Sequence, residues 1–529
     1  IFGLMPDWNP AEMIGYQPNR LSYSIYKKII TDESWSLARE KMGYKSVNEP
    51  LMYSFSGKPY IDTRLSFNSL IPKEVDKNVS KKLIKHWSKL LKEKSYLHDK
   101  IEFEIVDGSF DAYTKTKILK EYAFLNLKEK RNYESSLKNF TNNKILNFKN
   151  DFFELDKKLN RLEEERIKFI KKYNDSKNLL NKKEILGFVN KIKVFGTIPF
   201  SIYARYAFIA KKFLNSLNLK NLISDKLFSK LLNSVGSITN DFIELEKKSY
   251  INEKNRKKFI NYFYHLRPGT YNINVERNNN KLLDYKIDNV NQLLSKNTVI
   301  PKIPKKNKLI LENFLKKNKL SFSVNILLQF FLTSIKMREN SKFIFTRSLS
   351  DLIEIIKNKG KKYNLSNDYL SKLSFTEVTN LNKKNKSYFL NQIKKYEKNN
   401  FIHEKIKLPY LITNKNDFYI ASILISKPNF ITKNIVQGEL KSIESKKIKI
   451  SNKIVLIENA DPGFDWIFSY KIKGLITKYG GVNSHMSIRC EELNIPAAIG
   501  IGEDNYLKIK NFPKIILNCK NEQIIKLNL

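Results

Sequence analysis

The sequence predicts a multi-domain protein with a mainly α-helical N-terminal and middle region and a β/α domain at its C-terminus. At 529 residues the chain is too long for one compact core, so two or three domains are expected. From about residue 76, Lys, Glu and Asn alternate with Leu, Ile and Phe at steps of three and four residues, which is the spacing of amphipathic helices. After about residue 430 this spacing gives way to short apolar runs, which predict strands.

The first elements lie in a region with many turn-forming residues. Residues 1–75 are rich in turn formers and aromatic residues, and we interpret them as a turn-rich platform leading into the helical region, with a strand near 51–55. Residues 76–425 are predicted to be mainly helical and to hold the binding site of the protein. Within them Ser348 and Asp351 have the spacing of a capping box, which predicts a helix that begins at Leu352.

The last domain is predicted over residues 430–529, after a linker near 408–432. Apolar runs at 453–457, 474–477, 498–501, 514–518 and 523–527 predict buried or half-buried strands. These runs bracket one expected helix at about 484–493. About a hundred residues is a normal size for an independent domain.

The charge of the chain limits the classes of partner that it is expected to bind. The net charge is +43, but the excess is mostly Lys spread along helical runs, and Arg, which reads base edges better, is scarce. No specific nucleic-acid partner is therefore expected, and a basic nucleic-acid-associated helical protein remains an alternative.

No run of eighteen uncharged apolar residues exists, so no membrane span is expected. Cys490 and Cys519 supply no disulfide framework, which is typical of the cytoplasm, and no His/Glu spacing indicates a metal site.

The most informative motif lies near the C-terminus. Gly480 and Gly481 follow the predicted strand at 474–477, and Ser484 and His485 come next, at the start of the predicted helix. Paired glycines let the backbone turn sharply and approach a ligand closely, and a helix N-terminus offers free N–H groups to a phosphate. A histidine at this point can carry a phosphoryl group on its imidazole, so the motif predicts covalent relay through His485. The alternative is an ordinary capping or core histidine.

This motif resembles the signature of a known family. Two glycines, two further residues, a small polar residue, His485 and a short helix ending in Asn-Ile-Pro-Ala are similar to the swivelling phosphohistidine domain of phosphoenolpyruvate synthase, pyruvate phosphate dikinase and rifampin phosphotransferase. The segment from Asp461 to Trp466 resembles the Asp-Pro-x-Trp element that precedes the same strand. Many members carry Arg at the position of Glu491, whereas this chain has Arg489 two residues earlier, so the resemblance assigns Arg489 no phosphate contact.

The resemblance implies a mechanism and a domain order. A helical domain followed by a terminal phosphohistidine domain is closest to rifampin phosphotransferase, in which ATP phosphorylates the histidine, with release of AMP and phosphate, before transfer to a small-molecule acceptor. Ser484 and the N–H groups after Gly481 would stabilise the phosphoryl oxygens, and Asp465 would orient the docked domain. The chain begins with Ile1 and shows no glycine-rich nucleotide loop. Mg²⁺ and ATP are therefore expected on an ATP-grasp domain, either upstream or on a separate chain, and no pyruvate-binding barrel is expected after residue 529.

The acceptor site is predicted from arginines in a chain that otherwise prefers Lys. Arg64, Arg205 and Arg267 stand out, and Arg267 is the strongest because Pro268 and Gly269 would fix its backbone beside His265. The alternative for each arginine is a structural pair with a carboxylate. Segments around residues 6–12, 196–200 and 265–271 also resemble the central region of phosphoenolpyruvate synthase-like proteins. A non-catalytic partner protein of this family is the other alternative function, and the use of phosphoenolpyruvate or pyruvate is left open.

Overall fold

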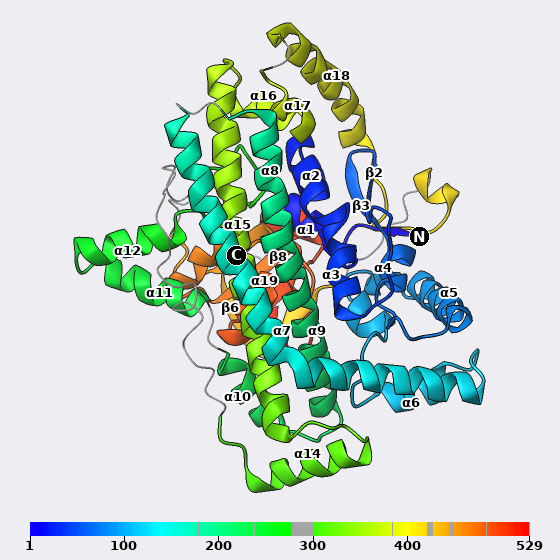
Figure 1. Cartoon of the computed structure of the whole chain (residues 1–529). Helices are drawn as coiled ribbons and strands as arrows, with labels where there is room; N and C mark the ends of the chain where they lie inside the picture. The colour runs from blue at the N-terminus through cyan, green and yellow to red at the C-terminus, as the bar shows by residue number, and fades with distance from the viewer. Residues whose placement is uncertain are drawn as a thin grey trace.

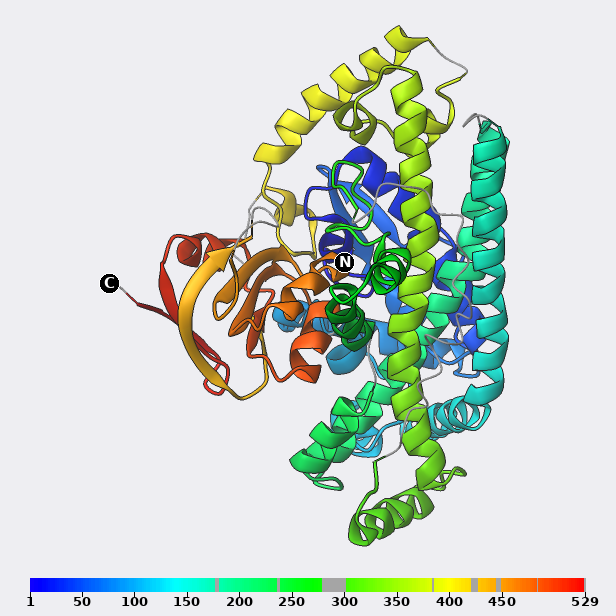
Figure 2. The same cartoon turned by 90° about the vertical axis from the view of Figure 1, so that its left-hand side faces the viewer.

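The computed structural model shows a helical body with a β/α domain docked against one side of it (Figures 1 and 2). It describes residues 1–176, 180–235, 238–277, 301–382, 385–419, 427–443, 449–482 and 484–527. The helical body comprises the described residues up to 419, and the C-terminal domain comprises those from 427 onward. Part of the predicted linker, residues 420–426, lies outside the described residues. The prediction of a helical region followed by a β/α domain is confirmed.

The helical body contains two long helices, α7 and α15, which run side by side in Figure 2. A small antiparallel sheet, in the order β2-β3-β1-β4, joins the first residues to those near 411. The elements of the body are as follows: β1 (Phe2–Gly3), α1 (Pro10–Ile14), α2 (Arg20–Tyr26), η1 (Lys27–Thr31), α3 (Ser34–Met42), β2 (Met52–Phe55), β3 (Lys58–Asp62), α4 (Thr63–Asn68), α5 (Lys77–Glu93), η2 (Ser95–Leu97), η3 (Ile101–Ile105), α6 (Thr114–Glu121), α7 (Leu127–Asp175), α8 (Lys182–Ile192), η4 (Lys193–Thr197), α9 (Ile198–Leu219), α10 (Asp225–Asn233), α11 (Ile238–Ser249), α12 (Glu253–Phe263), α14 (Lys305–Lys317), α15 (Val324–Lys362), α16 (Asn367–Ser371), α17 (Phe375–Thr379), α18 (Lys386–Lys405), β4 (Leu411–Ile412) and η5 (Lys415–Phe418).

One hydrophobic core unites the platform with the bundle. Apolar side chains of α2, α3 and α4 belong to the same buried cluster as those of α7, α9 and α15. The strand expected near 51–55 is β2, but the platform also contributes helices that its many turn formers did not predict. The platform and the helical bundle therefore form one packed body.

The predicted helix start at Leu352 is wrong, because α15 runs unbroken from Val324 to Lys362. Its N-cap is Ser323, whose Oγ accepts the N–H of Ile326 at 3.3 Å. Asp351 does not cap a helix but is a fully buried anion in mid-helix. It pairs with Arg166 of α7 at 3.0 Å and with Arg277 at 2.8 Å. The Ser348–Asp351 spacing fits a capping box, but the Asp351 carboxylate instead binds two buried guanidinium groups. The spacing alone could not distinguish these two roles.

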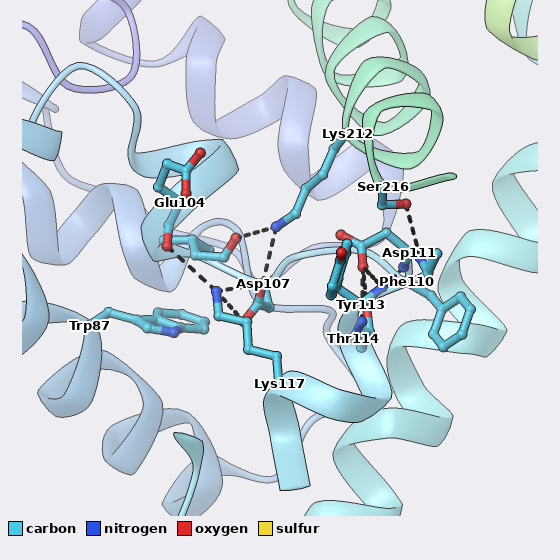
Figure 3. A network of polar contacts seen from close by, with 12 residues as sticks. Trp87, Glu104, Asp107, Phe110, Asp111, Tyr113, Thr114, Lys117, Lys212 and Ser216 are labelled. Carbon is cyan, nitrogen blue, oxygen red and sulfur yellow. Dashed lines mark hydrogen bonds and ion pairs between the residues drawn. The ribbon is translucent and has the colours of Figure 1, made fainter. Parts of the chain in front are cut away.

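A second buried carboxylate ties the start of the bundle to α9 (Figure 3). Asp107, in the loop after η3, is 3.1 Å from Lys117 of α6 and 3.1 Å from Lys212 of α9. Burial works to raise the pKa of Asp107, but the two lysines outweigh it and hold this pKa well below its usual range. This cluster is a structural anchor of the helical body.

The C-terminal domain is a seven-stranded sheet in the order β11-β10-β6-β7-β8-β9-β5. Strands β6 to β9 run parallel, and β5, β10 and β11 are antiparallel to their neighbours. Its elements are β5 (Asn429–Ile431), β6 (Ile435–Ser442), β7 (Ile454–Asn459), η6 (Pro462–Ser469), β8 (Gly474–Tyr479), α19 (His485–Glu492), β9 (Ala497–Ile499), α20 (Glu503–Lys510), β10 (Lys514–Asn518) and β11 (Gln523–Leu527).

Both faces of the sheet are buried at its central strands β7, β8 and β9, which explains the nearly continuous apolar sequence of these strands. Val455 and Ile457 of β7 pack on the side of α19, whereas Ile454 and Leu456 pack on the side of α20. The parallel strands end at the edge from which the loop to α19 departs. The predicted strands and the predicted helix at 484–493 are present within a few residues, and β5, β6, η6 and α20 are additions to the expectation.

One helical segment, Lys182–Leu219, is long and apolar enough to cross a membrane by length and composition. Most of its apolar stretch (61%) is buried inside the helical body, where core helices pass the same test.

Candidate functional site

The loop between β8 and α19 places His485 at the first position of α19. Ser484 is the N-cap, and its Oγ accepts the N–H of Ser487 at 3.1 Å and donates to Ser487 Oγ at 3.0 Å. Ser487 Oγ donates in turn to the carbonyl oxygen of Gly481 at 2.9 Å. These bonds close the turn and fix the direction of the His485 side chain. The role predicted for Ser484 in holding phosphoryl oxygens stays a prediction, because its hydroxyl is engaged as the cap.

Different constraints act on Gly480 and Gly481. Gly480 has a φ of +149°, and a Cβ there would lie 2.6 Å from Ala460 Cβ, so a side chain is excluded both by conformation and by space. Gly481 faces the helical body instead. Its N–H donates to Glu12 Oε2 at 3.3 Å, and a Cβ there would lie 3.1 Å from Asn9 Nδ2. The turn predicted to approach a ligand therefore approaches the wall of the helical body.

His485 is held between two carboxylates from different parts of the chain. Its Nε2 is 2.6 Å from Asp465 Oδ1, which belongs to η6 of the same domain. Its Nδ1 is 2.7 Å from Glu339 Oε2, which projects from α15 of the helical body. The imidazole is buried, with 5% of the residue's surface exposed. Asp465, predicted to orient the docked domain, thus contacts the histidine directly, and its docking role stays a prediction.

The carboxylates control the charge of the imidazole. Burial works to lower the pKa of His485, but Asp465 and Glu339 outweigh it, and the pKa is raised above its ordinary value. For Glu339, burial works to raise the pKa, whereas His485 and Arg338 hold it well below its usual range. In this docked arrangement the imidazole is therefore stabilised as a cation, and neither ring nitrogen is free to act as a nucleophile.

Arg489, to which the resemblance assigned no phosphate contact, lies one helical turn after His485. Its Nε is 3.4 Å from His485 Nε2, and its Nη1 pairs with Glu492 at 2.6 Å. Its Nη2 is buried, has no hydrogen-bond partner among the described residues, and lies 3.9 Å from Glu339 Oε2. A buried guanidinium nitrogen without a partner beside the histidine suits an anion.

Two cavities meet at His485. The first, which we name the Arg267 cavity, holds about 560 Å³ of empty space, part of it open to solvent, and is lined among others by His265, Arg267, Glu339 and Phe343. The second, the Trp8 cavity, holds about 870 Å³ by the same measure and lies among the first helices, α9 and α15, with Trp8 in its lining. Both are lined by His485 and by Lys342 of α15. A group on the imidazole is therefore within reach of two hollows of the helical body.

The structure brings Arg267 and His265 to the site, but the two side chains differ in whether their hydrogen-bonding groups are already occupied. The Arg267 guanidinium pairs with Glu354 at 2.9 Å and donates to Ser350 Oγ at 3.0 Å, inside the helical body. The His265 ring nitrogens are buried without hydrogen-bond partners among the described residues. Burial and the surrounding arginines hold the pKa of His265 well below its ordinary value, so its imidazole is neutral. Anion binding by Arg267 stays a prediction beside its structural pairing.

The backbone of the turn that carries Arg267 also contacts the C-terminal domain. Gly463 of η6 packs so closely on it that a Cβ there would lie 2.0 Å from the Arg267 carbonyl oxygen. Asp461 Oδ1 accepts the N–H of Gly463 at 2.7 Å and that of Gly269 at 3.2 Å. Backbone groups of this turn therefore form the seat on which the C-terminal domain rests.

The other two predicted arginines lie in different surroundings. Arg205 of α9 lines the Trp8 cavity, where it pairs with Glu102 at 3.3 Å and donates to the Tyr44 hydroxyl at 3.1 Å. Arg64 is largely exposed, pairs with Asp62 at 3.1 Å at the start of α4, and lines neither cavity. The structure thus gathers Arg205, but not Arg64, near His485.

Sequence reasoning missed Glu339, Lys342 and Glu12. Glu339 and Lys342 lie in a polar stretch of α15, residues 336–342, whose composition is that of a solvent-exposed helix turn, so no local signal indicated a buried site. Glu12 lies in α1, within a segment already noted for its resemblance to phosphoenolpyruvate synthase-like proteins. Among the residues that the structure describes, no group of three or more His, Cys, Asp or Glu side chains is arranged to hold a metal ion.

The C-terminal domain is similar to known proteins. Residues 449–522 match the model of the PEP-utilising enzyme, mobile domain. A stretch of 123 residues, 23% of this chain, is 36% identical to the phosphoenolpyruvate-protein phosphotransferase of Buchnera aphidicola subsp. Schizaphis graminum (strain Sg). The chain spans about a fifth of the length of that relative.

The C-terminal domain is therefore a mobile domain of the PEP-utilising enzyme type, and the chemistry that the match supports is phosphoryl transfer. His485 stands in the matched segment, at the head of α19.

Proposed function

We propose that this chain is a phosphotransferase that carries a phosphoryl group on His485 and passes it to a small-molecule acceptor bound in the helical body. One observation carries the proposal: the His485 imidazole lies between Asp465 of its own domain and Glu339 of the helical body, where two cavities meet. A core histidine needs neither the two carboxylates nor access to a cavity. The family chemistry of the C-terminal domain supports the same conclusion.

The surroundings of His485 suit a phosphoryl group. A phosphoryl group on either ring nitrogen displaces the carboxylate now bound there, because two anions cannot share the position. Positive charge is then at hand in Arg489, whose Nη2 lacks a hydrogen-bond partner among the described residues, and in Lys342, which lines both cavities. The first turn of α19 adds free backbone N–H groups. These groups would stabilise the phosphorylated histidine and the transfer from it.

Relay requires that the C-terminal domain leave its seat to meet a donor. When the domain leaves, Asp465 stays with the histidine and Glu339 remains on α15, so one ring nitrogen becomes available. The expected donor is ATP with Mg²⁺ on an ATP-grasp domain, upstream or on a separate chain. The name of the Buchnera relative offers phosphoenolpyruvate as a second donor. Either donor would load the same side chain.

Two other functions make different predictions. A non-catalytic partner protein of the same family would bind but would not form a phosphohistidine. A basic nucleic-acid-associated protein would bind duplex or single strands at physiological salt, whereas the dispersed Lys charge predicts only weak, salt-sensitive binding. A cytoplasmic location stays a prediction.

The test uses a donor that needs no partner domain. The chain is incubated with ³²P-phosphoramidate, which phosphorylates imidazoles directly, and the labelled residue is mapped. We expect a base-stable, acid-labile label on His485 that is lost in His485→Ala and retained in the control His403→Ala, a histidine outside both cavities. A label on Ser484, or an unchanged label in His485→Ala, would contradict the proposal.

A further inference from the structure

The Trp8 cavity has the walls of a binding site for an organic molecule. Its lining includes six aromatic side chains from four helices and the loop before α1: Trp8, Tyr26, Trp35, Phe200, Phe208 and Phe345. Aromatic walls bury a large apolar surface and fix the plane of a ligand. The same cavity is lined by His485. An acceptor bound here would therefore lie beside the phosphoryl group.

Several of the charges that line this cavity are already paired with one another. Arg39 pairs with Asp7, and Arg205 pairs with Glu102. Arg338 pairs with Glu339 at 3.2 Å. A guanidinium or carboxylate bound to a charged partner holds the cavity wall together. Burial raises the pKa of Glu102 to about 7, but the Glu102 carboxylate is bound to Arg205. These residues therefore shape the cavity.

Glu12 differs from these paired groups. Its Oε2 accepts the Asn9 side-chain amide at 3.2 Å and the N–H of Gly481 at 3.3 Å, and it forms no ion pair among the described residues. It is 4% exposed and lines the Trp8 cavity together with His485. The contact with Gly481 joins Glu12 to the turn that precedes the histidine. A carboxylate with only neutral hydrogen-bond donors, in the cavity that His485 enters, is placed to exchange a proton.

We propose, on the basis of the relay through His485 proposed above, that Glu12 is the proton acceptor in the transfer from phosphohistidine to an acceptor bound in the Trp8 cavity. The acceptor is a molecule with a hydroxyl or amine group. Its oxygen or nitrogen attacks the phosphorus, the phosphorus–nitrogen bond to His485 breaks, and the electron pair of that bond stays on the imidazole nitrogen. The proton of the attacking group moves to a Glu12 carboxylate oxygen, and then to solvent.

The surroundings of Glu12 suit this task. Burial raises the pKa of Glu12 to about 7, although Lys342 and Arg338 of α15, the Gly481 N–H and the Asn9 amide all act to lower it. A carboxylate that titrates near neutral pH is deprotonated often enough to accept a proton and basic enough to keep it. The Gly481 N–H reaches Glu12 only when the C-terminal domain is docked, so the proton acceptor is completed in the same state that presents the phosphoryl group.

The test follows the loss of label to water, the smallest hydroxyl acceptor. Wild type, Glu12→Gln, Glu12→Asp and the control Glu439→Gln, an exposed carboxylate of β6, are labelled with ³²P-phosphoramidate and freed of donor. Loss of phosphate from His485 is then timed between about pH 5.5 and 9, a range that brackets the expected titration. In wild type and in Glu439→Gln the part of the rate that is absent from Glu12→Gln should rise through about pH 7, where Glu12 titrates.

Glu12→Gln keeps the shape and can still accept both hydrogen bonds, but it cannot take a proton. We expect normal labelling of His485, a rate of loss reduced by roughly 10²-fold, and no rise near pH 7. Glu12→Asp should recover part of the rate and retain the rise. An unchanged rate in Glu12→Gln, or a slower rate with the same rise, would overturn the role of Glu12 and leave His485 as the carrier. If wild type forms no label on His485, both proposals fall.

Discussion

The two halves of the site around His485 differ in which groups belong to the domain of the histidine and which belong to the helical body. The C-terminal domain supplies groups that travel with the histidine: the Ser484 cap, Asp465 and Arg489. The helical body supplies groups that meet the histidine only in the docked state, Glu339 and Glu12, and both cavities lie against it. Under the proposed relay, this difference predicts that loading and discharge of a phosphoryl group depend on separate residues, so substitutions should separate the two steps.

The largest expected effect is on the stability of the helical body. Arg267→Ala removes one partner of the buried pair with Glu354, which keeps only Lys357 at 3.4 Å among the ion pairs of the described residues. Breaking a buried ion pair from one side costs about 3 kcal/mol or more in free energy of unfolding, measurable by denaturant titration. Arg64→Ala, which breaks an exposed pair, is the control and should cost less than about 1 kcal/mol. Normal stability with lost discharge in Arg267→Ala would instead favour the anion-binding role.

The next effect separates docking from loading. Gly463→Ala introduces a Cβ that would lie 2.0 Å from the Arg267 carbonyl oxygen, so the C-terminal domain cannot return to its seat. We expect normal labelling of His485 by phosphoramidate and a rate of discharge reduced by roughly 10²-fold, because misplacement of about 1 Å has this effect.

The control for this variant is Gly187→Ala in α8, where an added Cβ meets no atom within 4 Å. It should load and discharge as wild type does. Equal loss of both steps in Gly463→Ala would mean that the seat is also needed for loading, and the division between the two halves would fail.

A smaller effect distinguishes the two carboxylates. Asp465→Asn should slow both loading and discharge by roughly tenfold or more, because Asp465 stays with the imidazole in every position of the domain. Glu339→Gln should slow discharge alone, since Glu339 remains on α15. Rates of label uptake and label loss check both expectations. Slower uptake in Glu339→Gln would place Glu339 on the loading side.

The smallest expected effect is the pH dependence of the stability that the protonated His485 imidazole contributes to the folded state. The raised pKa of His485 means that the folded state favours the protonated imidazole, so this stabilisation is fully present below pH 6.5 and is lost as pH rises through the raised pKa. A difference of one between the folded and unfolded pKa corresponds to about 1.4 kcal/mol in free energy of unfolding. The difference in unfolding temperature between wild type and His485→Asn should therefore shrink between about pH 6 and pH 9. A difference that grows with pH would reverse the assigned charge.

The two halves also differ in how far the sequence could predict them. In the C-terminal domain, local signals suffice, because apolar strands, paired glycines and the cap before His485 lie within a few residues of the features that they specify. The partners of this motif are distant. Glu339 lies 146 positions from His485, and Glu12 lies 469 positions from Gly481.

No local pattern encodes contacts over such separations, so the contacts of Glu339 and Glu12 with this motif could not be predicted from the sequence. Asp351 shows the same limit. Its spacing predicted a helix start, whereas it lies in mid-helix and binds two buried arginines that are distant in the sequence. Arg64 shows the converse, because an unusual arginine in the sequence proved to be an exposed partner of Asp62.

The central claim is that His485 is both the docked cation and the phosphoryl carrier, and NMR of the chain with ¹⁵N-labelled histidine tests both at once. The chain has five histidines, so few imidazole signals are expected. We predict that one imidazole stays doubly protonated above pH 6.5, the ordinary pKa of histidine. The same imidazole should gain coupling to phosphorus after treatment with phosphoramidate, and its signal should be absent in His485→Ala. Phosphorus coupling on a different histidine, or a neutral His485 at pH 6.5, would contradict the account.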